Sequence, residues 1–530
     1  MSNEASFSTL EAKLAVRPNK AGLIVFIVIL IAGIGYVGFN LVSDLSGQET
    51  TSMLPFMLLG LALVIALGFE FVNGFHDTAN AVATVIYTNS LQPHVAVVWS
   101  GFWNFLGVVL SGGAVAFAII SLLPVELILQ VGSGAGFAMV FALLVAAIIW
   151  NLGTWYLGLP SSSSHTLIGS IIGVGLANQL VSASTGTSGV DWVQAGSIGK
   201  SLLISPLVGS ALAALLLLLA RRIIPDQRLY SPPEGDQPPP LWIRALLVLT
   251  CTGVSFAHGS NDGQKGMGLI MLILIGTVPT AFALNHAVTA RQTQEFIMAS
   301  QEAAAVFERH AAGSTASADP RSELTAYLRT RTAGPNTLLA TGQLIQELGV
   351  ELSSYGLLTK LPAARTRNFR NDLYLVGESI RLMQKSGPQE FSPSEWNTLT
   401  NYKRHVDLAT RFIPGWVKVS VAIALGLGTM IGWKRIVVTV GEKIGKDHLT
   451  YAQGAAAEIT AMTTIAAADS FGLPVSTTHV LSSAVGGAMA ANGSGLQWGT
   501  VRNLLMAWVL TLPASIILAG TLYWIFHSFV

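Results

Sequence analysis

Long stretches without a charged residue limit what this chain can fold into more than any other feature. Seven runs contain no Asp, Glu, Lys or Arg: Ala21–Ser43, Thr51–Phe69, Thr78–Val125, Leu127–Val190, Ser201–Ala220, Gly266–Ala290 and Asn503–Val530. Since about 18 to 20 apolar residues cross a bilayer as a helix, these runs predict many crossings. Only 11% of the 530 residues are charged, too few to cover a soluble surface. We therefore expect an all-α polytopic membrane protein embedded in a lipid bilayer.

Charge and cysteine content exclude several classes of protein. A soluble enzyme is excluded by the shortage of surface charge. The formal net charge of +1 gives no long-range field to attract a polyanion, so no nucleic-acid partner is expected. Cys251 is the single cysteine, which rules out an intramolecular disulfide and a clustered thiolate metal site. No cofactor is predicted.

Three segments lie outside the repeated membrane part. Residues 1–43 hold a basic cluster and an uncharged run that is too long for a signal peptide and has no cleavage site, which predicts an extra N-terminal transmembrane helix that begins in the cytoplasm. Residues 221–240 include the string SPPEGDQPPP and are expected to form a linker. Residues 291–411 hold 14 of the 29 basic and 12 of the 28 acidic residues, with helical spacing of apolar positions, and predict a soluble helical insertion.

The remaining sequence contains one unit twice. NGFHDTAN at Asn73–Asn80 aligns with HGSNDGQK at His258–Lys265, and GLPSSSSHTL at Gly158–Leu167 aligns with GLPVSTTHVL at Gly472–Leu481. The two offsets, 185 and 314 positions, differ by nearly the length of the insertion. The first transport repeat is therefore expected at 54–220, and the second at 241–290 and 412–530.

Hydropathy divides each repeat into about five crossings, with a break at the first motif. They are expected at 54–90, 95–122, 136–157, 164–181 and 197–220, and at 241–278, 412–433, 449–470, 473–492 and 500–527. An odd number makes the two repeats opposite in topology, the design of many secondary transporters whose sites lie at the midplane where broken helices meet. Basic residues of the loops fall on the predicted cytoplasmic side, and the same count places the insertion outside.

The first motif carries acids inside the predicted membrane segments. Glu70, Asn73, Asp77 and Asn80 share one helix face beside His76, and His258, Asp262 and Lys265 repeat the spacing of Asn73, Asp77 and Asn80. Because an intramembrane carboxylate needs a cavity or a partner, the two Asp residues predict cation or proton sites. Carboxylates that cap broken helix ends are the alternative. Gly74, Gly259 and Gly263 are expected to allow an unwound backbone.

The second motif places hydroxyl groups after Leu-Pro, at the expected start of a new helix. Free N–H groups and the positive dipole end of such a helix form an anion site, so two opposed copies could hold one tetrahedral oxyanion. The predicted binding residues are Ser161, Ser162, Ser163, Ser164 and Thr166, with Ser476, Thr477 and Thr478. Simple N-capping is the alternative.

These residues resemble the PiT family of inorganic phosphate transporters, of the bacterial low-affinity PitA type. The similarity rests on GFHDTANAVATVIYT, WNLGTWYLGLPSSSSHTLIG, HGSNDGQKGMGL, GTMIGWKRIVVTVGEKIGK, TYAQG and GLPVSTTHVLSSAVGG, and spans about residue 54 to the C-terminus. It implies a multi-pass symporter of the bacterial inner membrane that takes up inorganic phosphate with a cation gradient, as a homodimer. It also implies proton coupling and carriage of divalent-metal phosphate. Family ion and phosphate residues carry over onto Asn73, Asp77, Asn80, Asn261 and Asp262 and onto both hydroxyl clusters.

One departure from the family pattern bears on the coupling ion. Sodium-coupled relatives usually have Asn where this chain has Lys265, and His76 here precedes Asp77. A Lys ammonium could take the place of a bound sodium beside Asp262, and His titrates in a range suited to proton transfer. We therefore predict proton coupling. A fixed structural Lys265–Asp262 pair remains the alternative, and the roles of Glu458 and Asp469 stay open.

Other functions compete with phosphate symport. Asp77 and Asp262 could form an intramembrane aspartyl protease, but such a site has no use for duplicated hydroxyl clusters. An anion channel could use the same helix termini without needing paired acids. Sodium coupling, sulfate as substrate and the identity of any metal stay open at this level.

Overall fold

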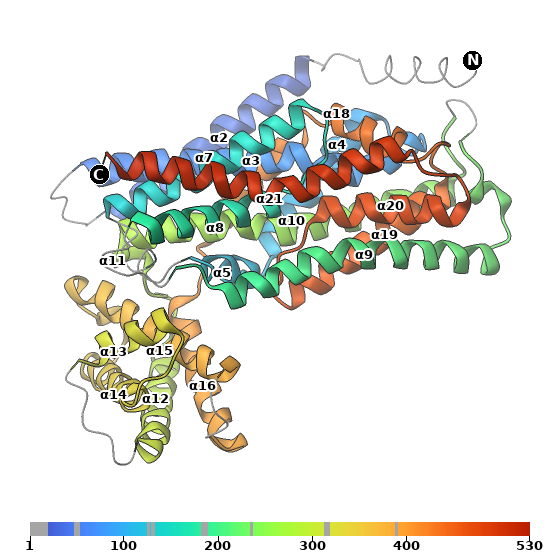
Figure 1. Cartoon of the computed structure of the whole chain (residues 1–530). Helices are drawn as coiled ribbons and strands as arrows, with labels where there is room; N and C mark the ends of the chain where they lie inside the picture. Colours follow the sequence, from blue (N-terminus) through green and yellow to red (C-terminus); the bar gives the residue numbers. More distant parts are fainter. Residues whose placement is uncertain are drawn as a thin grey trace.

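The protein is almost entirely helical. The computed structural model describes residues 20–46, 53–123, 128, 133–181, 189–233, 237–311, 319–386 and 391–529, without the side chains of residues 78–80 and 386. Within these ranges the only β-type pairing is an isolated bridge between Gly445 and Leu496. Figure 1 shows a long bundle of helices with a smaller helical body at one end.

Seven helices in the described ranges are long and apolar enough to cross a membrane. They are α2 (Lys20–Leu45), α3 (Leu54–Tyr87), α4 (Pro93–Leu110), α7 (Gly134–Tyr156), α9 (Trp192–Ile223), α10 (Leu241–Thr277) and α21 (Trp498–His527). An eighth span results if α16 (Pro393–Thr410) and α17 (Gly415–Thr429), which meet at 71°, count as one. The uncharged runs thus correctly predicted a multi-pass membrane protein, although they predicted more full crossings than these helices make.

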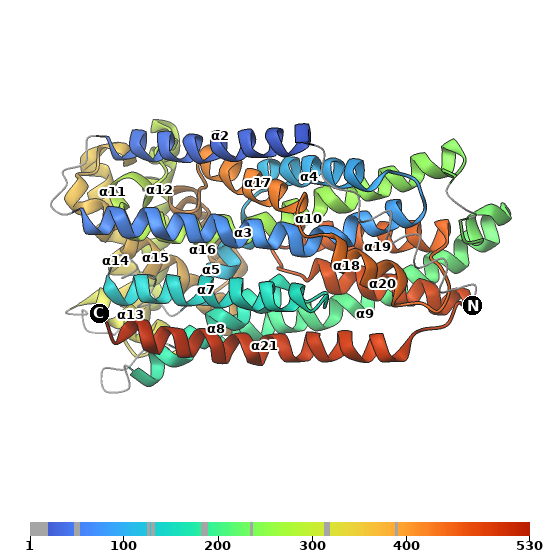
Figure 2. The same cartoon turned by 90° about the horizontal axis from the view of Figure 1, so that it is seen from above.

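Two helical hairpins account for part of the difference. In one, α7 is followed by α8 (Ser163–Val181); in the other, α19 (Tyr451–Ser470) is followed by α20 (Thr477–Asn492). Figure 2 shows α7 and α8 in the half of the bundle nearer the insertion, and α19 and α20 in the other half. The connections at 157–162 and 471–476, each together with the first turn of the helix that follows, are here called the first and second tips. They meet inside the bundle.

The second residue of each tip is a glycine in the left-handed region. Gly158 has φ 67° and Gly472 has φ 64°, a conformation that side chains disfavour and that reverses the chain after the preceding helix. The Leu-Pro pair follows in each case, and a new helix begins at Ser163 and at Thr477. The helix break and restart expected from the sequence are therefore confirmed.

The expected break at the acidic motifs is wrong. Helices α3 and α10 run without interruption through Asp77 and Asp262. The motif glycines serve close packing: a Cβ on Gly74 would overlap the carbonyl oxygen of Leu425 in α17, and a Cβ on Gly259 would overlap that of Asn104 in α4. Close approach of two helices, and not an unwound backbone, is what these glycines permit.

Helix pairing between the two halves is reciprocal. α3 packs on α17 while α10 packs on α4, and α8 packs on α21 while α20 packs on α9. Gly173 of α8 leaves room for the carbonyl of Ile516, and Gly487 of α20, 314 positions later, does the same for the carbonyl of Ser210. This exchange is the pattern expected of two related repeats, whose inverted topology stays a prediction.

Short helices complete the bundle and its ends. These are α5 (Ala114–Ile120), α11 (Pro279–Phe282), α18 (Lys434–Glu442) and the 3₁₀ turn η1 (Gln227–Tyr230). A second 3₁₀ turn, η2 (Leu358–Lys360), lies in the insertion. α9 extends to Ile223, so the first three residues of the predicted linker, 221–223, are helical.

The insertion has its own hydrophobic core. It comprises α12 (Ala290–His310), α13 (Pro320–Thr330), α14 (Thr337–Tyr355), α15 (Ala363–Ser386) and α16. Figure 2 shows that α3 begins at the end of the bundle that carries the insertion, here called the insertion end. The exact domain boundaries stay predictions.

Candidate functional site

Asp77 connects both hairpin tips to α3. Its carboxylate accepts a hydrogen bond from Ser163 Oγ at the start of α8 (2.9 Å) and from Thr478 Oγ1 in the first turn of α20 (2.6 Å). The residue is 2% exposed. The sequence motifs, separated by hundreds of residues, therefore meet at one buried carboxylate.

Asp262 forms the matching contact from α10. Its Oδ2 accepts from Ser163 Oγ (3.3 Å) and lies 2.6 Å from Lys265 Nζ. Lys265 also donates to Ser164 Oγ (2.5 Å), which in turn donates to the carbonyl of Val475 in the second tip (2.7 Å). Lys265 is thus a buried cation that joins an acid of α10 to both tips.

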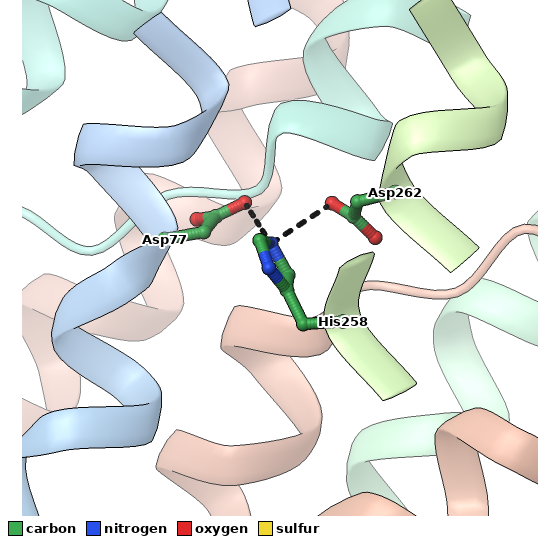
Figure 3. A group of neighbouring side chains, drawn as sticks. All are labelled: Asp77, His258 and Asp262. Carbon is green, nitrogen blue, oxygen red and sulfur yellow. Dashed lines mark ion pairs between the residues drawn. The ribbon is translucent and has the colours of Figure 1, made fainter. Parts of the chain in front are cut away.

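His258 lies between the two carboxylates. Figure 3 shows its ring, on α10, between Asp77 and Asp262. Its Nε2 lies 3.9 Å from Asp77 Oδ2 and 3.6 Å from Asp262 Oδ2, and the ligand atoms of the three residues lie within 4.8 Å of one another. Two carboxylates and one imidazole are a suitable ligand set for a divalent cation.

Asn104 of α4 orients this imidazole. The Asn104 amide group donates to the carbonyl and the hydroxyl of Ser100, so its Oδ1 is left to accept from His258 Nδ1 at 2.6 Å. That bond places the proton of a neutral ring on Nδ1 and directs the Nε2 lone pair at two carboxylates. Nε2 makes no hydrogen bond among the described residues, nor does Asp262 Oδ1. A proton or metal ion between these atoms would relieve the repulsion.

His76 touches the other side of Asp77. Its Nδ1 lies 3.1 Å from Asp77 Oδ1, while Nε2 lies 3.3 Å from Thr154 Oγ1 and 3.4 Å from Ser161 Oγ. Thr154 and Ser161 are themselves hydrogen-bonded at 2.8 Å. Ser161 therefore belongs to the surroundings of His76, a predicted proton-coupling residue.

Other predicted anion ligands act as helix caps. Ser162 Oγ accepts from the N–H of His165 and Ser476 Oγ from the N–H of His479, each at 3.1 Å. Thr166 donates to the carbonyl of Ser162 at 2.9 Å. Capping thus describes Ser162 and Ser476, and Thr166 bonds back to the carbonyl four residues earlier. In contrast, Ser163 and Thr478 bond to the acids and Ser164 bonds to Lys265. Thr477 Oγ1 is buried and has no hydrogen-bond partner among the described residues.

The amides of the acidic motifs lie around this centre. Asn261 donates to the carbonyl of Leu473 in the second tip (3.2 Å), and Asn73 donates to Glu70 Oε2 (3.4 Å). The Asn80 side chain lies outside the described residues.

Three residues of the site were absent from the predicted set. The sequence could have indicated His258, since this residue lies four positions before Asp262 and so on the same helix face. Asn104 and Thr154 gave only the weaker signal of a polar residue in an apolar segment. Their roles depend on contacts between helices that no local pattern encodes.

Taken together, hydroxyl donors from two opposed helix starts face two acids in a buried centre. An anion could bind at the helix starts only if the negative charge of Asp77 and Asp262 is offset. Lys265 offsets one charge. The other needs a proton or a bound cation, so the centre can couple binding of an anion to binding of a cation.

Comparison with known proteins gives a consistent family assignment. The chain is 44% identical over 496 residues to the low-affinity inorganic phosphate transporter PitA of Escherichia coli K12, which covers 89% of this chain and 97% of that relative. It is 40% identical over 494 residues to a low-affinity inorganic phosphate transporter of Buchnera aphidicola from Acyrthosiphon pisum (88% and 96% covered). A solved structure titled "The sodium-dependent phosphate transporter" aligns with a TM-score of 0.49 and 19% identity over 89% of this chain and 100% of that chain.

The family model agrees with these relatives. The model described as the phosphate transporter family matches residues 73–519 and so includes both acidic motifs and both tips. Since this match covers well over half of the sequence, the chain belongs to the phosphate transporter family.

Proposed function

We propose that this multi-pass protein of the bacterial inner membrane takes up inorganic phosphate by symport, driven by the proton gradient. The observation that carries the proposal is the convergence of Ser163 and Thr478, from two separate helix starts, on the Asp77 carboxylate. An oxyanion that took over the hydrogen bonds now accepted by this carboxylate would face hydroxyl donors and helix N-termini from both halves of the chain.

Phosphate suits this centre better than sulfate. Near neutral pH phosphate carries a proton, which it can donate to a carboxylate, whereas sulfate carries none and would be repelled. Asp77 and Asp262 both lie within hydrogen-bond distance of Ser163, so an anion bound there has acids beside it. A sulfate symporter is the alternative.

Proton coupling is supported by the resident cation. Lys265 Nζ already neutralises Asp262 at 2.6 Å, where a sodium-coupled protein would need a bound ion. His76 and His258 place two titratable rings against Asp77. Sodium coupling remains the alternative.

A divalent metal could travel with phosphate as cargo. Asp77, His258 and Asp262 would hold it, with Asn104 fixing the ring that supplies Nε2. The metal would bridge the acids and a phosphate held by the tips. Neutral metal phosphate would then bind without unpaired charge.

Two features of the assembly belong to the same proposal. Inverted repeats would let the hairpin tips open alternately to either side, with the insertion outside the cytoplasm. A homodimer is expected from the family resemblance.

The test is uptake of labelled phosphate into proteoliposomes with proton, sodium and magnesium gradients imposed separately. Accumulation is expected with acid outside and no sodium. Uptake that required sodium and ignored the pH gradient would contradict proton coupling. Sulfate uptake as fast as phosphate uptake would contradict the proposal that phosphate is the substrate. Equilibration of phosphate without accumulation would indicate a channel. Labelled substrate recovered unchanged would argue against an enzyme.

A further inference from the structure

Glu70 is a buried acid that the proposed mechanism leaves without a role. It lies on α3, seven residues before Asp77, and its exposed fraction is 0%. Seven residues of helix amount to about 10 Å. Because α3 begins at the insertion end, Glu70 lies nearer to that end than Asp77 does (Figure 2). With the insertion outside the cytoplasm, as proposed above, this is the side from which phosphate and protons would enter.

The contacts of Glu70 are too weak for a buried carboxylate. Oε2 accepts one long bond from Asn73 Nδ2 at 3.4 Å. Oε1 has no hydrogen-bond partner among the described residues and lies against Gly266 of α10, where a Cβ would overlap the carboxyl group. An ionised carboxylate with so little compensation is costly in a membrane interior. The arrangement fits a carboxyl group that holds a proton in this conformation.

The charged groups that face Glu70 are Lys265 and Asp262 of α10. From its own helix Glu70 meets the neutral amide of Asn73, and Lys418 of α17 is directed away, to the carbonyl of Ser111. The helices α4 and α7 contain no Asp, Glu, Lys or Arg. Lys265 is therefore the cation that an ionised Glu70 would attract.

Lys265 is engaged elsewhere in the present conformation. Its ammonium group bonds to Asp262 (2.6 Å) and to Ser164 (2.5 Å), and Ser164 holds Val475 of the second tip. With Glu70 neutral, the ammonium group stays at the helix starts, where it can offset an anion and tie the two tips together. With Glu70 ionised, a second acid competes for the same ammonium group.

We infer that Glu70 carries the coupling proton. Lys265 links the protonation state of Glu70 to the phosphate site, because its ammonium group pairs with Asp262 when Glu70 is protonated and with Glu70 when Glu70 is ionised. A proton from the outer water binds the Glu70 carboxylate, and Lys265 remains at Asp262 and Ser164 while phosphate binds. Once phosphate has left, the proton passes to the cytoplasmic water, and Lys265 pairs with Glu70. Release of Ser164 then loosens the connection between the tips. One coupling proton, carried by Glu70, enters with each phosphate, while the charge of Asp77 is offset by the proton that phosphate itself brings.

This inference rests on the proposed proton-driven uptake and is tested with Glu70→Gln, which imitates the protonated acid. In proteoliposomes, Glu70→Gln should exchange labelled phosphate between equal solutions at the wild-type rate. It should lose accumulation under a pH gradient. For one proton per phosphate, a gradient of one pH unit drives about tenfold accumulation in the wild type. Glu302→Gln, on an exposed position of α12, is the matched control.

An infrared measurement gives a readout besides transport. Wild-type protein should show the carbonyl stretch of a buried carboxylic acid. Glu70→Gln should lose the contribution of Glu70 in a variant-minus-wild-type difference spectrum, in which the bands of other buried acids such as Glu458 cancel. If Glu70→Gln does not fold, Glu70→Asp takes its place. Because the Asp side chain is one methylene group shorter, its carboxylate lies farther from Lys265, and the outside pH of half-maximal uptake should shift.

The outcomes separate the two hypotheses. A wild-type protein that ignores the pH gradient overturns the proposed coupling itself. A responsive wild type with an equally responsive Glu70→Gln overturns the inference alone, as does parallel loss of exchange and accumulation in that variant. An unchanged infrared band, or an unchanged pH profile in Glu70→Asp, has the same consequence.

Discussion

Single hydrogen bonds decide which atoms of the site can bind a cation. Within the part of the chain that the structure describes, the Asn104 side chain forms no hydrogen bond with a predicted anion ligand, yet its bond to His258 Nδ1 determines which ring nitrogen faces Asp77 and Asp262. Such supporting residues are typically worth about 10–100-fold in metal affinity.

Asn104→Leu is therefore expected to weaken manganese binding in the presence of phosphate by about 10–100-fold. The His258 ring would lose its acceptor and present Nε2 less often as a free ligand. Titration calorimetry on the purified protein measures the effect. Asn40→Leu, on the exposed face of α2, is the control. Equal affinities in Asn104→Leu and wild type would show that the imidazole binds no metal.

At the scale of elements, helices pack at the distance that glycine permits. α3 contains one glycine at a helix contact and one at an open position. Gly74 lies against the backbone of α17, whereas Gly68 has no heavy atom within 4 Å of an added Cβ. The comparison can therefore be made within one helix.

Gly74→Ala is expected to lower the unfolding free energy by about 1–3 kcal/mol, because the methyl group forces α3 away from Leu425. Gly68→Ala should leave stability unchanged or raise it by up to about 1 kcal/mol through helix propensity. Thermal unfolding in detergent compares the two. Equal melting temperatures would mean that α3 and α17 are not in close contact.

At the scale of the whole molecule, one carboxylate connects the insertion to the bundle. Asp191, which caps α9, accepts from the N–H of Gln194 (3.0 Å) and from Arg331 and Arg381 of the insertion (3.0 and 3.1 Å). Burial alone would raise the pKa of Asp191, but the N–H of Gln194 and the two guanidinium groups outweigh burial and lower it. α9 packs on α20, so this contact reaches the helix that carries Thr478.

Because the pKa of Asp191 is lowered in the folded protein, the contact between the insertion and the bundle should weaken at acidic pH. Stabilisation by the Asp191 carboxylate is fully present above the ordinary Asp pKa of about 3.9 and is lost as the pH falls through the lower folded value. Protection from hydrogen exchange at the start of α9 and in α15, taken relative to the intrinsic exchange rate at each pH, should therefore stay constant from neutral pH down to about 5 and fall below about 4. Asp191→Asn should accelerate exchange already at neutral pH, while Glu302→Gln should not. Unchanged protection in Asp191→Asn would rule out this contact as a clamp.

The sequence alone determined the class of the protein and named several of the residues that meet in its candidate site. Uncharged runs required membrane helices because a bilayer offers no partner for charge. The duplicated motifs named Asp77, Asp262 and the hydroxyls of Ser163 and Thr478, since residue types and helix starts are local properties.

Only the tertiary structure decided how these groups meet. Continuous α3 and α10, the contact of both tips with one carboxylate, and the place of His258, Asn104 and Lys265 all depend on helices that approach from distant parts of the chain. Side-chain spacing encodes the faces of single helices, but the distance and rotation between helices come from packing of the whole bundle. That packing turns two acidic motifs and two capping sequences into one buried site.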